Sequence, residues 1–159
     1  MRPALIAVLA LLAFPTPGIA QDLLIGRASV IDAEAIEIRG QRQRLIGIDA
    51  VEAAQTCRKG QNLWPCGRRA ANALAGFIGR SNVTCAPVGQ VSFGRTLADC
   101  HVRGREIQQW LITEGWAVLY RTDGKAWAVE LANAIAANRG IHAGEFIAPQ
   151  DWRAGKRWN

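Results

Sequence analysis

Apolar and polar residues alternate along the first half of the chain in the way that strands require. Ala35-Ile-Glu-Ile38 is the clearest case, and Arg39-Gly40-Gln41 after it supplies a turn to the next apolar stretch. The sequence predicts five strands, at Leu23–Ile31, Ala35–Ile38, Gln43–Ile48, Asn82–Pro87 and Arg95–Val102. A short further strand is expected at Ala117–Tyr120.

Apolar residues at helical spacing predict three helices. The first runs from about Gly67 to Ile78, the second contains Ile107 and Leu111 and stops at Gly115, and the third carries Trp127, Leu131 and Ile135. Five strands, with one helix between the third and fourth and other helices near the end, fit an α+β fold. We therefore predict a five-stranded OB-type β-barrel with three helices.

The N-terminal residues have the features of a secretory signal. Arg2 precedes an apolar run, Ala4–Phe14, that is too short to span a bilayer, and the small residues Gly18-Ile-Ala20 follow it. We expect residues 1–20 to be a cleaved signal peptide, in preference to an uncleaved membrane anchor. The mature protein is then expected to be a monomer, periplasmic or secreted, without a membrane partner.

Charge narrows the choice of partner. The chain has a net charge of +6, which favours polyanions such as nucleic acid or acidic polysaccharide. Residues 21–150 are expected to form one domain. Residues 151–159, with Arg153, Lys156 and Arg157, are expected to form a solvated basic tail.

Four cysteines follow the predicted signal, and an even number in an exported chain indicates two disulfides. Three connectivities are possible. We favour Cys57–Cys66, which closes a short loop, and Cys85–Cys100, which joins two arms of a predicted hairpin. A zinc site is the alternative, but the sequence contains no CxxC pair and only two histidines, far apart.

Acidic residues lie at the ends of predicted strands. Asp32 and Glu34 belong to one turn, and Asp49 and Glu52 come just after the strand that ends at Ile48. Carboxylates that converge from neighbouring strands can share a calcium ion, which accepts several oxygens in flexible geometry. The alternative is that these are ordinary polar residues of turns.

Several sequence blocks, in the right order, resemble those of staphylococcal-type thermonucleases. They are Val30–Ile38, Arg44–Glu52, Phe93-Gly-Arg-Thr-Leu-Ala98, Gly115-Trp-Ala117, Asn138-Arg-Gly-Ile141 and Pro149-Gln-Asp-Trp-Arg153. The resemblance covers nearly the whole mature chain. The pattern of four cysteines resembles that of exported bacterial members of the family.

The resemblance implies hydrolysis of DNA and RNA with the help of Ca²⁺. Asp49 matches one of the family's two calcium-binding aspartates, Glu34 stands where the other is found, and Ala50 matches the residue that offers a backbone carbonyl. Glu52 matches the glutamate that orients or deprotonates the attacking water. The family therefore implies a calcium-dependent phosphodiesterase.

The same resemblance assigns roles to residues that face the substrate. Arg44 and Arg95 match the arginines that bind the phosphate and stabilise its charge in the transition state. Tyr120 is one residue away from the position at which the family has a tyrosine that lines the substrate site. Phe93 stands where a tyrosine near the phosphate is usual.

The chain departs from the family at one calcium-binding block. It reads Asp32-Ala33-Glu34-Ala35 where Asp-Gly-Asp-Thr is usual, so the carboxylate of Glu34 sits one methylene further from the backbone. An error of about one ångström in a catalytic site can cost about a hundredfold in rate. Two hypotheses follow: a nuclease of reduced activity, or an OB-type module that binds nucleic acid or acidic polysaccharide without cleaving it.

Overall fold

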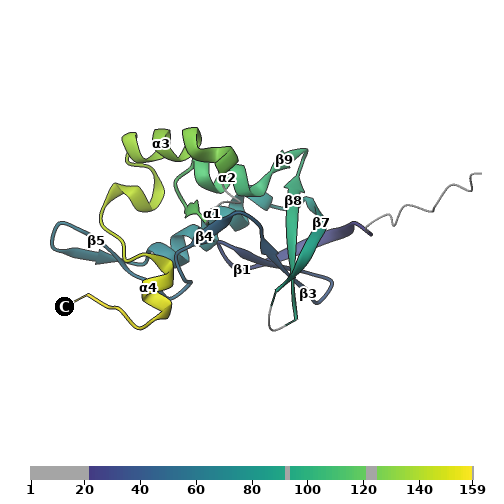
Figure 1. Cartoon of the computed structure of the whole chain (residues 1–159), viewed down its shortest axis with the longest axis horizontal. Helices are drawn as coiled ribbons and strands as arrows, with labels where there is room; N and C mark the ends of the chain where they lie inside the picture. The colour runs from purple at the N-terminus through teal and green to yellow at the C-terminus, as the bar shows by residue number, and fades with distance from the viewer. Residues whose placement is uncertain (1–21, 92–93, 121–124, 159) are drawn as a thin grey trace, which may run out of the picture.

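The computed structural model describes residues 22–91, 94–120 and 125–158, and its centre is a closed β-barrel (Figure 1). Neighbouring strands pair in the order β3-β2-β1-β7-β8, and β3 also pairs with β8 in parallel, which closes the barrel. The five strands are β1 (Leu24–Asp32), β2 (Ala35–Ile38), β3 (Gln41–Leu45), β7 (Asn82–Val91) and β8 (Arg95–Val102). The predicted five-stranded barrel of an α+β fold is confirmed.

The turn between β2 and β3 follows directly from its sequence. Arg39 and Gly40 both have positive φ angles, 51° and 76°. A tight two-residue turn between strands with a right-handed twist requires such angles. Pairing from Ile38 with Gln41 to Ala35 with Arg44 then fixes the register. Because of this register, Arg44 lies beside the turn that carries Glu34.

The predicted strand Gln43–Ile48 is in fact two strands. Strand β3 ends at Leu45, and Gly47, with a φ angle of 76°, turns the chain before β4 (Ile48–Ala50). Strand β4 leaves the barrel sheet and pairs antiparallel with β10 (Ala117–Leu119). The change of direction brings Asp49 towards the end of the barrel where β1 and β2 meet.

Four α-helices surround the barrel in the described residues, one more than predicted. They are α1 (Cys66–Ile78), α2 (Ile107–Thr113), α3 (Ala128–Ala136) and α4 (Pro149–Arg153), and the 3₁₀ helices η1 (Lys125–Trp127) and η2 (Gly140–Ala143) precede and follow α3. In Figure 1, α2 and α3 lie together on one side of the molecule, and α4 lies on the other side, near β5. No described helix has the length and apolar character needed to cross a bilayer.

The segment after Glu52 contains structure that the sequence did not predict. Strands β5 (Cys57–Lys59) and β6 (Asn62–Trp64) form a hairpin in what we expected to be a loop. Another short strand, β9 (Arg105–Glu106), pairs with β8. Both additions are too short for a periodic pattern to reveal.

The core joins the barrel to α1 and α2. Ala70, Leu74 and Ile78 recur at spacing four on α1 and are fully buried, as the predicted helical face requires. Gly67, in the first turn of this helix, lies so close to the preceding loop that an added Cβ would be 1.7 Å from the carbonyl oxygen of Glu52. Only glycine fits there, so helix α1 supports the segment that carries Glu52.

Both favoured disulfides are confirmed. Cys57 bonds to Cys66 and links β5 to the start of α1, whereas Cys85 bonds to Cys100 across the paired strands β7 and β8. The first disulfide therefore stabilises the loop region next to Glu52, and the second stabilises the barrel wall.

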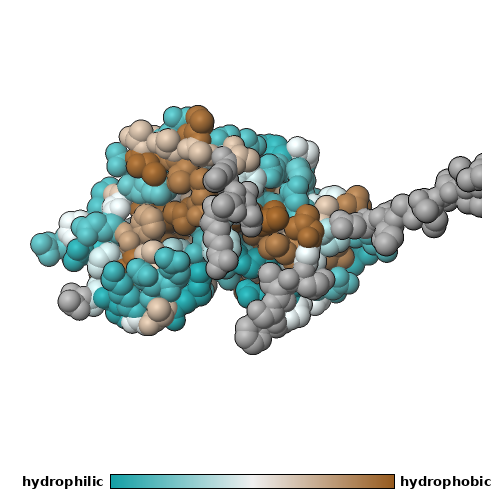
Figure 2. Space-filling model, viewed as in Figure 1, coloured by the Kyte–Doolittle hydropathy of each residue, from teal (hydrophilic) through white to brown (hydrophobic). Residues whose placement is uncertain are grey.

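The molecular surface is uneven in polarity. Figure 2 shows apolar residues gathered in the middle of the viewed face, between α3 and α4, while α4 and the segment around β5 are hydrophilic. The C-terminal segment is fixed to this region by the indole N–H of Trp158, which donates to the carbonyl of Thr56 at 2.9 Å. The guanidinium of Arg58 lies over the ring of Trp158, 4.6 Å from its centre.

Candidate active site at the end of the barrel

Two buried carboxylates meet where the turn after β1 approaches β4. Glu34 is 7% exposed and Asp49 is 5% exposed, and their carboxyl groups are within hydrogen-bonding distance of each other. The backbone N–H of Ala50 donates to Oε2 of Glu34 at 3.1 Å. Ala33 and Ala35, which flank Glu34, are themselves buried, so the small side chains let this turn pack against the barrel.

Burial changes the acidity of this turn. It is the main reason that the pKa of Glu34 rises from 4.5 to about 8; the nearby Arg44 opposes the rise and Asp49 adds to it. Burial also raises the pKa of Asp32, against the effect of the Glu34 N–H, which donates to Asp32 Oδ1 at 2.9 Å. Near neutral pH the Glu34 carboxyl is therefore mostly protonated, and a metal cation bound to it would displace this proton.

Arg44 is the first guanidinium of the site. Its Nη1 lies 2.8 Å from Oε2 of Glu34, and its Nη2 donates to the carbonyl of Ile48 at 3.3 Å. The ring centre of Tyr120 is 5.8 Å from the guanidinium carbon, and the Tyr120 N–H donates to the carbonyl of Gly47. These contacts hold Arg44 in one position at the edge of the barrel.

Arg95 approaches the same place from the first position of β8. It is half-buried, and its Nε is buried without a hydrogen-bond partner among the described residues. Leaving a buried donor unpaired costs about 1–3 kcal/mol. This donor is therefore free to bind an acceptor on a ligand.

Most of the predicted functional side chains line one cavity of about 300 Å³, a size at the lower end of small-molecule sites, whereas Asp49 and Ala50 are not among its lining residues. Its lining residues are Asp32, Glu34, Arg44, Glu52, Arg95, Tyr120 and Arg153. The structure thus brings together residues from the β1–β2 turn, β3, the loop after β4, β8 and the segment after β10. Phe93 lies outside the described residues.

One residue of the cavity was missed by the sequence analysis. Arg153, at the end of α4, donates from Nη1 to Asp49 Oδ1 at 3.1 Å and from Nη2 to Asp49 Oδ2 at 3.1 Å, a bidentate contact. The same Nη1 lies 2.9 Å from Oε1 of Glu52. The prediction of a solvated tail is therefore wrong for this side chain.

A local signal for this helix was present in the sequence. Pro149 occupies its first position, Asp151 lies in its first turn and Arg153 in its last turn, an order that suits helix geometry and the helix dipole. At five residues, the helix is too short to show an apolar period. Its contact with Asp49 spans 104 residues of sequence, which no local pattern reveals.

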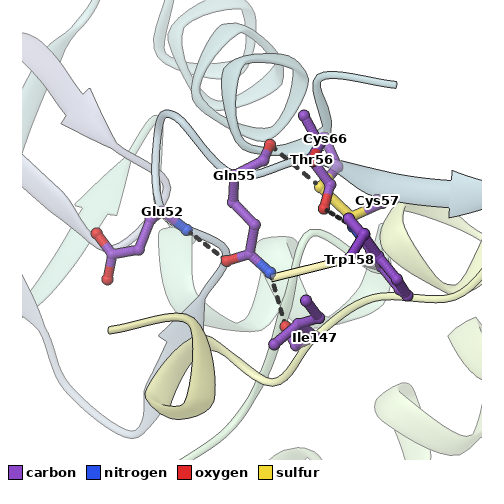
Figure 3. The surroundings of a disulfide bond; sticks show 7 residues. All are labelled: Glu52, Gln55, Thr56, Cys57, Cys66, Ile147 and Trp158. Carbon is purple, nitrogen blue, oxygen red and sulfur yellow. Dashed lines mark hydrogen bonds between the residues drawn. A yellow bond between two sulfur atoms is a disulfide. The ribbon is translucent and has the colours of Figure 1, made fainter. Parts of the chain in front are cut away.

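Gln55 holds the loop that carries Glu52 (Figure 3). Its side-chain Oε1 accepts from the backbone N–H of Glu52 at 3.1 Å. Its backbone N–H donates to the backbone carbonyl of Glu52 at 2.8 Å. Its Nε2 donates to the carbonyl of Ile147 at 2.6 Å, which ties the loop to the chain just before α4. In Figure 3 the carboxylate of Glu52 points away from Gln55 and the disulfide, so these contacts fix the backbone without engaging the functional group.

The predicted calcium ligands satisfy some requirements of a hard cation. Among the described residues, no three His, Cys, Asp or Glu side chains are arranged as a metal site. Glu34 and Asp49 nevertheless offer adjacent carboxylate oxygens, which calcium prefers, and Arg153 already places positive charge on Asp49. The two carboxylates therefore fit a cation by charge and by donor type.

Comparison with known proteins agrees with this architecture. The family described as staphylococcal nuclease homologues matches residues 42–139, which include Arg44, Asp49, Glu52 and Arg95. A protein named succinoglycan biosynthesis protein ExoI, from Rhizobium meliloti (strain 1021), is 39% identical over 123 residues, covering 75% of this chain and 64% of that protein. A probable staphylococcal-like nuclease, CAN3, from Oryza sativa subsp. japonica, is 34% identical over 125 residues, covering 75% of this chain and 30% of that protein.

The chain spans less than two thirds of the length of either relative. The family match nevertheless covers more than half of this chain and includes most of the residues that line the cavity. The predicted resemblance is confirmed, and the chain belongs to the staphylococcal nuclease-like family.

Proposed function

We propose that this protein is an exported, calcium-dependent nuclease that hydrolyses phosphodiester bonds of DNA and RNA. The observation that carries the proposal is the single cavity lined by Arg44, Arg95 and Glu52 beside the carboxylate of Glu34. Two guanidinium groups and a half-exposed carboxylate can bind one phosphate and one water molecule at the same time. Membership of a nuclease family supports the same reaction.

Each residue has a distinct role in this proposal. Arg44 and Arg95 donate to the non-bridging oxygens of the phosphate, whose charge grows in the transition state. Glu52 accepts a proton from the water that attacks phosphorus in line with the leaving oxygen. Tyr120 lines the substrate site, and Phe93, outside the described residues, is a candidate substrate contact by its match to the family.

The proposed metal centre uses the buried carboxylate pair. Glu34, Asp49 and the backbone of Ala50 would hold calcium, which when bound supplies positive charge to a phosphate oxygen. Glu34 reaches the site with one methylene more than an aspartate would. We therefore expect reduced activity, and we expect Glu34→Asp to increase the rate by correcting the position of the carboxylate.

The disulfides and the N-terminal sequence support a location outside the cytoplasm. Two disulfides suit an oxidising compartment, and residues 1–20 have the features of a signal peptide. We propose a periplasmic or secreted monomer. The net charge of the full chain, +6, suits a polyanionic substrate.

A second candidate function is binding of acidic polysaccharide without catalysis. The observation that favours it is the relative named for succinoglycan biosynthesis, at 39% identity, together with the basic charge of this chain. Such a module would bind polyanions in a salt-sensitive way without calcium and independently of Glu52.

The test is cleavage of single-stranded DNA by the purified mature protein, with calcium or with a chelator. We expect calcium-stimulated cleavage that falls by a factor on the order of 10²–10⁴ in Glu52→Gln, the usual contribution of a general base. Binding to the same DNA and to an acidic polysaccharide is measured in parallel. Polysaccharide binding that resists chelation, without any cleavage that depends on Glu52, would favour the second function and reject the first.

A further inference from the structure

Arg153 is a cation supplied by the protein itself to the carboxylates of the candidate site. Its guanidinium contacts both oxygens of Asp49 at 3.1 Å and one oxygen of Glu52 at 2.9 Å. Bidentate contacts of this kind are the strongest form of charged hydrogen bond in proteins. The contacts with Asp49 and Glu52 also raise the pKa of Arg153, so it stays fully charged.

These contacts occupy the oxygens that a calcium ion needs. Calcium binds oxygen ligands at about 2.3–2.6 Å and takes six to eight of them, from carboxylates, carbonyl groups and water. A guanidinium bound to both oxygens of Asp49 leaves no room on that side for a second cation, and two cations so close repel each other strongly in a buried site. Arg153 and calcium therefore compete for Asp49.

The element that carries Arg153 can move without disturbing the barrel. Helix α4 has only five residues, and the side chain of Arg153 is 40% exposed, whereas that of Asp49 is 7% exposed. The neighbouring contacts, from Trp158 to Thr56 and from Gln55 to Ile147, fix the chain on both sides of the helix. When the guanidinium leaves Asp49 for solvent, α4 loses this contact and is loosened between the two anchoring contacts, which stay in place.

We propose that Arg153 sets the calcium affinity of the site, because calcium binds Asp49 only after displacing this side chain. The inference rests on the proposed calcium centre. It assigns to the C-terminal segment a function that the barrel residues alone do not have: while Arg153 is docked it keeps Glu52 paired, and its release frees Glu52 to bind water. Metal loading and exposure of the general base are thereby coupled.

The experiment is calorimetric titration of calcium into the mature wild-type protein and Arg153→Ala at the same pH and ionic strength. By linkage, removing a competitor strengthens binding, and we expect calcium affinity to rise about tenfold. Arg157→Ala is the matched control, because Arg157 lies in the same segment but stacks on Trp152, and none of its contacts with the described residues is with a carboxylate. The control should bind calcium as the wild type does.

A second measurement uses wild type only, so it does not depend on the folding of a variant. Amide hydrogen exchange of residues 149–155 should become faster when calcium is added, while exchange in α1 stays the same. Equal calcium affinity in wild type and Arg153→Ala, or unchanged exchange of 149–155 in calcium-saturated wild type, would overturn the inference alone. Absence of calcium binding in every protein would overturn the proposed metal centre together with this inference.

Discussion

The candidate site has two halves. Each pairs an arginine with a carboxylate, but the pairs differ in burial and in the elements that position them. In the inner half, Arg44 pairs with Glu34 inside the barrel, and both side chains are largely buried. In the outer half, Arg153 pairs with Glu52, and both side chains are about one-third exposed. The inner pair is positioned by strand register, whereas the outer pair is positioned by a loop and a five-residue helix.

The difference suggests that the inner half holds fixed charges and the outer half holds charges that can move. A buried ion pair is costly to break from one side, because the remaining charge has lost its water. An exposed pair, such as Arg153 with Glu52, is worth little and breaks easily. Arg153 also contacts buried Asp49 in a bidentate way, and that contact breaks only when another cation replaces it. We infer that the inner half provides the rigid phosphate and metal contacts, and that the outer half provides the groups that must be released before reaction.

The largest expected effect is removal of the inner guanidinium. Arg44→Ala leaves Glu34 buried without its cation, so above about pH 8, where Glu34 is ionised, we expect the free energy of unfolding to fall by about 3–5 kcal/mol, together with loss of cleavage. Urea denaturation measures the first quantity. Arg42→Ala on the same strand is the matched control: Arg42 pairs with Glu37 at the surface, and its loss should cost less than about 1 kcal/mol.

Equal costs for Arg42→Ala and Arg44→Ala would contradict the distinction between a buried pair and an exposed pair. A large loss of stability without any loss of cleavage would keep the distinction and remove Arg44 from the proposed mechanism.

A smaller effect is expected from the disulfide beside the outer half. Replacing Cys57 and Cys66 by serine opens a short loop, which by loop entropy should cost about 2–3 kcal/mol. Replacing Cys85 and Cys100 should cost a similar amount, since that loop is only slightly longer. Only the first change loosens the segment that holds Glu52, so only it should lower cleavage at temperatures where both variants remain folded.

Thermal unfolding followed by circular dichroism and cleavage of single-stranded DNA check the two quantities. If both double variants lost activity to the same extent while folded, the disulfide near Glu52 would have no special role in positioning the outer half.

A further expected effect is on the pH dependence of stability. Burial raises the pKa of Glu34 from 4.5 in the unfolded chain to about 8 in the folded protein, so between these values the folded state binds more protons. The free energy of unfolding in calcium-free buffer should therefore decrease as pH rises from about 5 to 8, and this contribution is fully present only at lower pH. Glu34→Gln stays neutral and should lack this part of the slope.

Urea denaturation of both proteins at several pH values measures the difference. The difference in stability should move in favour of Glu34→Gln as pH rises. A difference that stays constant, or moves the other way, would show that Glu34 is ionised in the folded protein throughout this range.

The inner half could be predicted from sequence because its information is local or belongs to the barrel. The turn at Arg39-Gly40 and the alternation in Ala35–Ile38 specify a hairpin, and this hairpin places Arg44 beside Glu34. The two disulfides followed from short spacings. The family blocks then identified Glu52 and Arg95, whose side chains line the cavity. They also identified Asp49, which contacts the lining residue Arg153.

The outer half could not be predicted to the same extent. The β5–β6 hairpin and α4 are too short to carry a periodic signal, and they depend on a disulfide and on contacts with distant segments. The block Pro149-Gln-Asp-Trp-Arg153 was recognised as part of the family pattern, but its basic residues were interpreted as a solvated tail. The partner of Arg153 is set only by the folded chain.

The most direct test of the central claim follows the oxygen atom that enters the product. Single-stranded DNA is incubated with the mature protein and calcium in water enriched in oxygen-18, and the product phosphates are analysed by mass spectrometry. Hydrolysis by a water molecule activated by Glu52 predicts one labelled oxygen per cleaved bond, only with calcium, and a yield on the order of a hundredfold or more lower in Glu52→Gln. Absence of labelled product from wild type, or an equal yield from Glu52→Gln, would contradict the claim that this site is a nuclease.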